Sequence, residues 1–268
     1  MKRLGYWLLA VSATGLIFPL GGCKSNSTEK QNDDGRNAAE SATQPITPLD
    51  PATLGTISGT VHFSGKPPVP VKIDMSQDPV CSMTGGDNFA EQYAVHDGKV
   101  ANVYLYLKSG PPAAMSAPAP KNVAASVMDQ AGCKYVPHAI AIMRGESVEF
   151  TNSDSTMHNI HTLPTAEGSQ PIDISQGAKG VPQAKQFNQA EAMIPVRCNN
   201  HPWMNAFVNV SATPFFALTG ADGRFTIAGL PAGTYTLAAV HEKLGEQTIT
   251  VTVAPKSVAK TDFTFKAQ

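Results

Sequence analysis

The stretch "GADGRFTIAGLPAGTYTLAAVHEKLGEQTITVTV", residues 220–253, decides the fold class. Three segments in it alternate apolar with polar residues, as strands with one buried face do: RFTIA (224–228), TYTLAAV (234–240) and QTITVTV (247–253). The Asp-Gly of ADGR (221–224) and the Pro-Ala-Gly of LPAG (230–233) are turn signals. The stretch therefore predicts a run of short antiparallel strands.

The same alternation occurs upstream, in TISGTVHF (56–63), NVYLYL (102–107), SVEFT (147–151) and FVNVS (207–211). The chain has 22 Gly and 21 Pro, which favours many turns. The Pro-rich stretch PPAAMSAPAP (111–120) predicts an exposed loop, and no stretch after residue 54 shows helical periodicity over three turns. We predict an all-β protein with more than one pair of packed sheets.

Two stretches resemble the carboxypeptidase regulatory-like, transthyretin-type β-sandwich. They are GRFTIAGLPAGTYTL (223–237) and GTISGTVHFSGKP (55–67), which looks like the opening strand of that family. The resemblance implies one sandwich with the middle of the chain inserted after its first strand, since insertions are tolerated in exposed loops. The alternative is that residues 55–67 belong to the central domain. Sandwiches of this family usually support or bind and do not catalyse.

The start of the chain is typical of an export signal. Lys2 and Arg3 precede an apolar run over residues 4–20. A transmembrane anchor is the alternative, but the run is short for one and Pro19 closes it. The sequence LGGC (20–23) resembles a bacterial lipobox, which implies cleavage before the cysteine and acylation of Cys23.

The residues after the lipobox imply a tethered envelope protein. Lys24 directly after the cysteine resembles the sorting signal for the outer membrane rather than the inner one. The polar stretch 23–54 predicts a flexible tether. We expect a lipid-anchored protein of the bacterial cell envelope that faces the periplasm or the exterior. The net charge of −1 gives no indication of nucleic-acid binding.

The four cysteines divide unequally. Cysteines of exported proteins normally pair, and lipidation of Cys23 leaves three, so one remains unpaired. Cys81 (in DPVCSM) and Cys133 (in QAGCKY) lack the neighbours of Cys198, which lies in RCNNHPWM (197–204). We predict a Cys81–Cys133 disulfide and a free thiolate at Cys198.

The stretch RCNNHPWM leaves three interpretations of Cys198: half of a disulfide, a thiol nucleophile, or a metal ligand. A thiolate, the imidazole of His201 and the thioether of Met204 together favour copper, because zinc rarely takes methionine. A blue copper site needs a second histidine. The stretch GESVEFTNSDSTMHNIHTL (145–163) supplies His158 and His161 after a predicted strand.

Together these stretches resemble the cupredoxins, in particular their amicyanin and pseudoazurin-like branch. GESVEFTN looks like the strand before the first histidine ligand, and CNNHPWM has the compact Cys-x-x-His-x-x-Met ligand loop. The resemblance implies one type 1 copper held by four ligands: His158, Cys198, His201 and Met204. It also implies that the backbone amide of Asn159 bonds the cysteine sulfur, which tunes the metal centre. The whole chain looks like methylamine-utilisation-like bacterial lipoproteins with a plastocyanin-like copper domain.

Several features have more than one interpretation. The polar stretch between Pro164 and Ala192 is long for this family and is expected to cover the metal or dock a partner. His138 either joins the two other cysteines in a second metal site or is a hydrogen-bonded histidine beside a disulfide. Trp203 is either core packing or an exposed docking residue. The remaining histidines are expected to be ordinary surface or strand residues: His62, His96, His161 and His241.

Four functions compete. The first is one-electron transfer at copper with an unknown redox partner protein. A metal with four protein ligands has no free position for a substrate, so this site favours an electron carrier over an enzyme. The others are copper delivery, a thiol enzyme using Cys198 and His201, and a structural or ligand-binding envelope module. The domain boundaries that we expect are a signal peptide (1–22), a tether (23–54), strands of the regulatory-like sandwich with Cys81 (55–98), a Greek-key cupredoxin-like domain (99–212) and the smaller regulatory-like sandwich (213–268).

Overall fold

The computed structural model of this chain describes residues 49–85 and 88–267. The predicted signal peptide, the lipidation site at Cys23 and all but the last residues of the predicted tether lie outside these ranges. Within the described ranges, no helix combines the length and the apolar character needed to cross a membrane.

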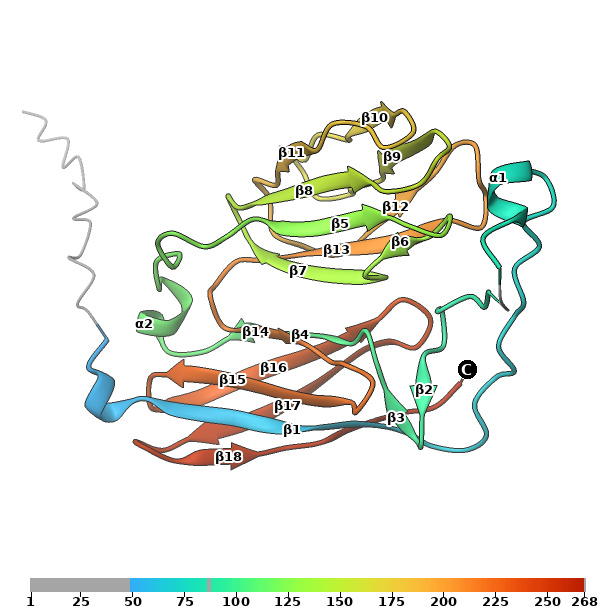
Figure 1. Cartoon of the computed structure of the whole chain (residues 1–268). Coiled ribbons are helices and arrows are strands. Elements are labelled where there is room, and N and C mark those ends of the chain that lie inside the picture. The colour runs from blue at the N-terminus through green and yellow to red at the C-terminus, as the bar shows by residue number, and fades with distance from the viewer. Residues whose placement is uncertain (1–48, 86–87, 268) are drawn as a thin grey trace, which may run out of the picture. The chain divides into compact units, whose positions relative to one another are not determined.

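The regular secondary structure of the described chain is almost entirely β, which confirms the predicted fold class (Figure 1). Three one-turn helices interrupt it: η1 (Pro51–Thr53), α1 (Pro79–Ser82) and α2 (Pro112–Met115). The strands are β1 (Gly55–Phe63), β2 (Val95–His96), β3 (Lys99–Val100), β4 (Tyr104–Ser109), β5 (Ser126–Gln130), β6 (Tyr135–Val136), β7 (Ala139–Met143), β8 (Ser147–Asn152), β9 (His158–Thr162), β10 (Asp173–Gln176), β11 (Gln183–Gln186), β12 (Glu191–Arg197), β13 (Asn205–Ser211), β14 (Phe216–Leu218), β15 (Arg224–Leu230), β16 (Gly233–His241), β17 (Gly245–Val253), β18 (Val258–Lys260) and β19 (Phe263–Phe265).

Two sheets form what we call the terminal sandwich. One has the order β15-β1-β3-β2, with β18 and β19 also paired to β1, and the other has the order β14-β4-β16-β17. β1 runs antiparallel to β15 and parallel to β18 and β19, so the first described strand shares a sheet with the last ones. A Cβ on Gly59 would lie 1.7 Å from the carbonyl oxygen of Thr261, so glycine is required where β1 passes from one parallel partner to the next.

The expected boundary at residue 99 is wrong. β3 pairs with β1, and β4 pairs with β14 and β16, so both strands belong to the terminal sandwich. Leu105 and Leu107 of β4 are buried in its core. An alternating strand shows that it has one buried face but does not show which of two cores that face joins, because both cores are apolar.

The Pro-rich stretch 111–120 agrees only in part with the expected exposed loop, since most of its residues are exposed but two are buried. It contains α2, and its Ala114 and Ala117 are buried in the core of the terminal sandwich. The small apolar side chains between the prolines allow this segment to pack against the core of the terminal sandwich. The sequence prediction took only its proline residues into account.

The second pair of sheets forms the central sandwich, with orders β10-β9-β12-β13-β7 and β11-β8-β5-β6. Its core includes Met128, Phe150, Ile160 and Val208. Cys81 is buried in this core and not in the terminal sandwich, although we expected it among the strands of residues 55–98. A segment from before β2 thus crosses to the central sandwich.

The long polar stretch 164–192 extends both sheets of the central sandwich. β10 pairs with β9, and β11 pairs with β8, each antiparallel and at a sheet edge. Its polar composition suits edge strands that face solvent.

Candidate metal centre

The start of β9 delivers His158 to the interior of the central sandwich. β8 ends at Asn152, whose side-chain amide donates to the carbonyl oxygens of Thr156, Gln176 and Gly177 at 2.9, 3.1 and 2.8 Å. These bonds fix the turn between β8 and β9. His158 follows it and is fully buried.

The loop between β12 and β13 supplies the other three predicted ligands. The Cys198 amide donates to the Met204 carbonyl at 3.3 Å, and the Met204 amide donates to the His201 carbonyl at 2.9 Å. This closed loop holds Cys198, His201 and Met204 in place, and all three are buried.

Three of the four predicted ligands converge on one point. Nδ1 of His158 lies 2.9 Å from Nδ1 of His201, and Sγ of Cys198 lies 3.5 Å from the same His201 nitrogen. The three donor atoms all lie within 4.8 Å of one another. The backbone amide of Asn159 donates to Sγ of Cys198 at 3.3 Å, as the resemblance implied.

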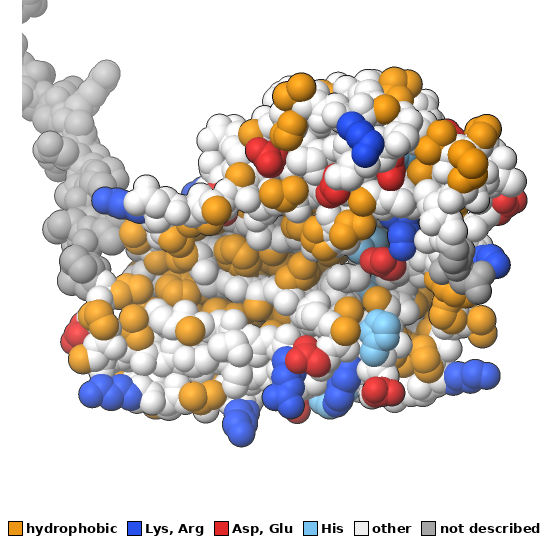
Figure 2. All heavy atoms as spheres, in the orientation of Figure 1, with side chains coloured by type: hydrophobic (Ala, Val, Ile, Leu, Met, Phe, Trp, Pro, Cys, Tyr) orange, Lys and Arg blue, Asp and Glu red, His pale blue; other side chains and the backbone are white. Residues whose placement is uncertain are grey.

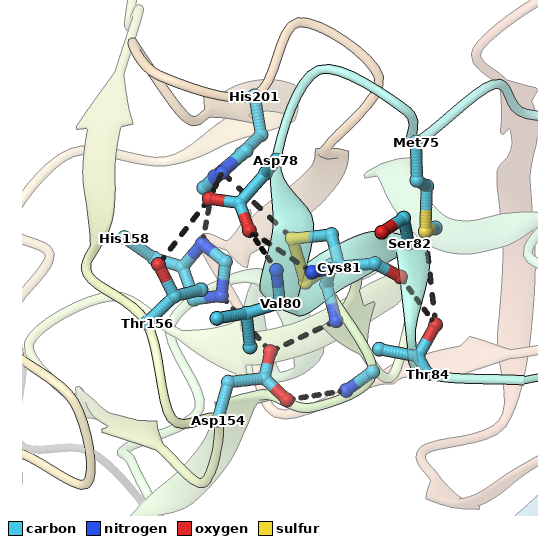
Figure 3. The surroundings of a disulfide bond; sticks show 12 residues. Met75, Asp78, Val80, Cys81, Ser82, Thr84, Asp154, Thr156, His158 and His201 are labelled. Atoms are coloured by element: carbon cyan, nitrogen blue, oxygen red, sulfur yellow. Dashed lines mark hydrogen bonds and ion pairs between the residues drawn. A yellow bond between two sulfur atoms is a disulfide. The ribbon is translucent and has the colours of Figure 1, made fainter.

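Each imidazole also meets a carboxylate, which the sequence did not indicate. Nε2 of His158 lies 2.9 Å from Asp154, and Nε2 of His201 lies 3.1 Å from Asp78 (Figure 3). Asp154 lies four residues before His158, so its closeness in sequence could have indicated that the two side chains interact. Asp78 is remote in sequence from His201, and no pattern links the two.

Hydrogen bonds and burial shift the pKa values of this cluster. The backbone amide of Cys81 lowers the pKa of the Asp78 carboxyl, and the bond to His201 lowers it further against the effect of burial. Burial lowers the pKa of His158, against the opposing effect of Asp154. Burial raises the pKa of Tyr135, whose hydroxyl donates to the carbonyl of Asn159. The first two shifts favour a charged carboxylate on Asp78 and a neutral imidazole on His158.

The donor set fits a metal ion. Because Nε2 of each imidazole faces a carboxylate, we assign the imidazole hydrogens to Nε2, which leaves a lone pair on each Nδ1. Two lone pairs that face each other at 2.9 Å repel, and a cation bound between them removes that repulsion. Two imidazoles and a cysteine sulfur are donors that suit copper, and Met204 on the same loop as Cys198 carries a thioether.

The cysteine prediction is confirmed. Cys81 and Cys133 form a disulfide, whose surroundings Figure 3 shows. Cys198 is the free cysteine among the described residues. A disulfide between Cys81 and Cys133 also removes the second metal site that His138 was considered for. His138 instead pairs with Glu242 of the terminal sandwich.

The structure also places His161, Trp203 and His241, for which the sequence analysis had given expectations. His161 is bonded to Asn199 and lies apart from the three converging donors. Trp203 is half-buried against the central core and donates its indole hydrogen to the Cys133 carbonyl, so core packing describes it better than a free docking residue. His241 is a strand residue, as expected, because it ends β16; it is buried, with 2% of its surface exposed.

Comparison with protein families identifies one class of domain in the chain. Residues 196–266 match the family model of the carboxypeptidase regulatory-like domain. The match begins at the end of β12 and takes in the loop with the candidate ligands, β13 and β14 to β19, while β1 and β4, which complete the two sheets of the terminal sandwich, precede it. The match thus falls mainly on the terminal sandwich and overlaps the end of the central sandwich. No curated protein matches the sequence.

Solved copper proteins resemble part of the chain. A Cu(I) amicyanin variant aligns at 23% identity over 40% of this chain and 97% of its own, with a TM-score of 0.29. The purple cupredoxin of Nitrosopumilus maritimus aligns at 24% identity over 32% of this chain and 99% of its own, with a TM-score of 0.26. The copper-containing nitrite reductase of Thermus scotoductus SA-01 aligns at 20% identity over 36% of this chain, with a TM-score of 0.30, and the alignment spans only 26% of that enzyme.

Proposed function

We propose that this chain binds one type 1 copper ion and carries single electrons. The observation that carries the proposal is the convergence of two imidazole Nδ1 atoms and one thiol sulfur in a buried site, with a backbone amide directed at that sulfur. His158, Cys198 and His201 would hold the metal, and Met204 on the same loop supplies the thioether. Copper held by these residues would supply a one-electron Cu(I)/Cu(II) couple.

The protein's own contribution is a rigid cage. The loop from Cys198 to Met204 is closed by backbone hydrogen bonds at both ends, and His158 is fixed by the turn that Asn152 organises. Carboxylates hold the outer nitrogen of each imidazole. A cage that keeps one geometry in both oxidation states suits electron transfer, since little has to rearrange when the charge changes.

Burial of the ligands favours a carrier over an enzyme. His158 is 0%, Cys198 5% and His201 3% exposed, so a substrate has no direct approach to a metal held by these residues. On the face that Figure 2 shows, side chains of both charge signs are interspersed. With a net charge of −1, this agrees with a protein partner or partners for electron exchange and not with nucleic acid.

We further propose that the chain works in the bacterial cell envelope. Acylated Cys23 would anchor it in a membrane, the outer one in preference to the inner one, and residues 24–48 would lead from the lipid to the first described residues. This placement rests on the lipobox-like sequence and on the disulfide, which suits an oxidising compartment.

The spectrum of the copper-loaded protein tests the proposal. We expect an intense visible thiolate-to-copper band and the matching EPR signature, and we expect Cys198→Ser to abolish both. His161→Ala is the matched control, since this histidine lies on the same strand as His158 but bonds Asn199, and it should leave the colour unchanged. A colourless protein that binds one zinc ion would contradict the proposal.

A further inference from the structure

One side of the metal centre is covered by a segment from a distant part of the chain. We call residues 75–84 the cap; it contains α1 and reaches the centre from before β2. Figure 3 shows its Asp78 and Cys81 directed at His201. Asp78 Oδ2 lies 3.1 Å from His201 Nε2, and Cys81 Sγ lies 3.8 Å from the same nitrogen.

The two oxygens of Asp78 make different contacts. Oδ1 accepts from the backbone amides of Val80 and Cys81 at 2.7 and 3.0 Å, which caps the start of α1. Oδ2 faces His201 and lies 3.4 Å from Thr156 Oγ1. Capping a helix needs only one oxygen, so the contact with His201 goes beyond what α1 itself requires.

The cap is also fastened covalently. Its Cys81 is bonded to Cys133, which follows β5 in the central sandwich and donates its backbone amide to Asp154, the carboxylate beside His158. The disulfide therefore lies between the two carboxylate–histidine pairs. With the cap in place, His201 is only 3% exposed.

From these contacts we propose that Asp78 is a positioning residue for the ligand His201, and that the disulfide-fastened cap retains the bound metal. Asp78 holds Nε2 so that Nδ1 faces the other ligands, and the cap blocks rotation of the imidazole toward solvent. The inference rests on the proposed function, because it requires that His201 binds metal. Outer partners of histidine ligands typically change metal affinity about 10- to 100-fold.

The rate of metal release tests this. The protein is loaded with Co(II) and mixed with excess EDTA, and the loss of the thiolate-to-cobalt absorption band is followed over time. Co(II) is chosen because the thiol reagent used in a later experiment does not change its oxidation state. Asp78→Ser retains a helix-capping oxygen but cannot reach His201, whereas Asp78→Ala loses both contacts. We expect both variants to release the metal about 10- to 100-fold faster than the unmodified protein.

Two further experiments distinguish a specific effect of the cap on metal release from a general loss of stability. Asp74→Ala is the matched control. Asp74 directly precedes the cap, and its carboxylate accepts the backbone amide of Ser76. We therefore expect this variant to release the metal at a rate within about twofold of that of the unmodified protein. In the unmodified protein, a dithiol reduces the disulfide to two thiols and is itself oxidised to a cyclic disulfide. Metal release from the reduced protein should then accelerate to the extent expected for Asp78→Ser. Because this experiment uses the unmodified protein, it tests the inference even if a variant fails to fold.

The outcomes distinguish this inference from the proposed function. If the unmodified protein binds cobalt but Asp78→Ser and disulfide reduction leave the release rate unchanged, the inference is wrong and the metal site stands. If Asp78→Ala alone accelerates release, Asp78 only caps α1 and the inference is again wrong. If the unmodified protein binds neither cobalt nor copper, both are wrong.

Discussion

The backbone amide of Asn159 donates to Sγ of Cys198 at 3.3 Å, so the residue after the candidate ligand His158 contacts the sulfur of the candidate ligand Cys198 on another loop. The Asn159 side chain donates to Ser175 Oγ at 2.8 Å, which ties β9 to the edge strand β10 and steadies that amide. A donor on the sulfur withdraws electron density from the thiolate and thereby favours Cu(I).

Asn159→Ala should therefore lower the reduction potential. Loss of the tie to Ser175 loosens the amide–sulfur bond, and a net hydrogen-bond free energy of about 1 kcal/mol corresponds to a shift on the order of 40 mV for one electron. Protein-film voltammetry measures this shift. Ser175→Ala removes the same tie from the other side and should move the potential in the same direction; a rise in either variant would contradict the assignment.

Asp154→Ala should weaken metal binding. Asp154 bonds Nε2 of His158 and also accepts the backbone amides of Gly132 and Cys133 at 2.7 and 2.8 Å. We expect metal affinity to fall about 10- to 100-fold in a competition titration with a chromophoric chelator. Asp129→Ala is the control, since Asp129 bonds Thr151 in the same sheet and contacts none of the ligands. Equal affinities in the two variants would show that Asp154 does not orient His158.

The three converging donors lie in two short segments that the sequence analysis had singled out. Cys198 and His201 share one loop with Met204, and His158 begins a strand that follows a recognisable one; the choice of these residues came from the resemblance to cupredoxins. Asp78 could not be predicted, because its contact with His201 depends on how a remote segment crosses to the central sandwich. The same crossing places Cys81 in a core where we did not expect it. Independently, β4 pairs with β14 and β16 and so lies outside the domain predicted for it. Strand alternation fixes which face is buried but not which partner buries it.

Removal of the disulfide should destabilise the fold. The bridge spans 52 residues, and the chain-entropy estimate for a loop of that length is about 4 kcal/mol. The double variant Cys81→Ala, Cys133→Ala should therefore show a lower urea midpoint and a steeper transition slope, because the unfolded chain without the bridge is more expanded. Peptide mapping without reductant should find Cys81 joined to Cys133 in the metal-free protein. A bridge that includes Cys198 would contradict both the pairing and the copper ligands.

Cys23→Ala should release the protein from the membrane without changing the copper site. The prediction follows from the lipobox-like sequence, because no other lipid attachment is proposed. A flexible segment of the length predicted for the tether spans on the order of 30 Å, long enough to leave the centre free of the bilayer surface. Cell fractionation and the visible spectrum of the released protein measure both results. A variant that stayed in the membrane fraction would favour an uncleaved transmembrane anchor.

Acid should destabilise the terminal sandwich through His241, which ends β16. Burial lowers the pKa of His241 to about 4, even though the nearby Glu242 opposes the shift. Its Nδ1 accepts the amide of Lys243 at 3.2 Å, and its buried Nε2 has no partner in the described chain. The neutral imidazole is thus the form that the folded protein tolerates.

The sign follows from this depressed pKa. The unfolded chain binds a proton below about pH 6.5 while the folded protein resists it down to about pH 4, so stability is full above pH 6.5 and falls as the pH drops between these values. The loss from this one group between pH 7.5 and 5 is about 2 kcal/mol. His241→Asn keeps an acceptor for the Lys243 amide but cannot titrate, so its loss of stability over that range should be smaller by about this amount. Urea unfolding of both proteins at pH 7.5, 6 and 5 measures the difference, and parallel curves would show that His241 is protonated in the fold without penalty.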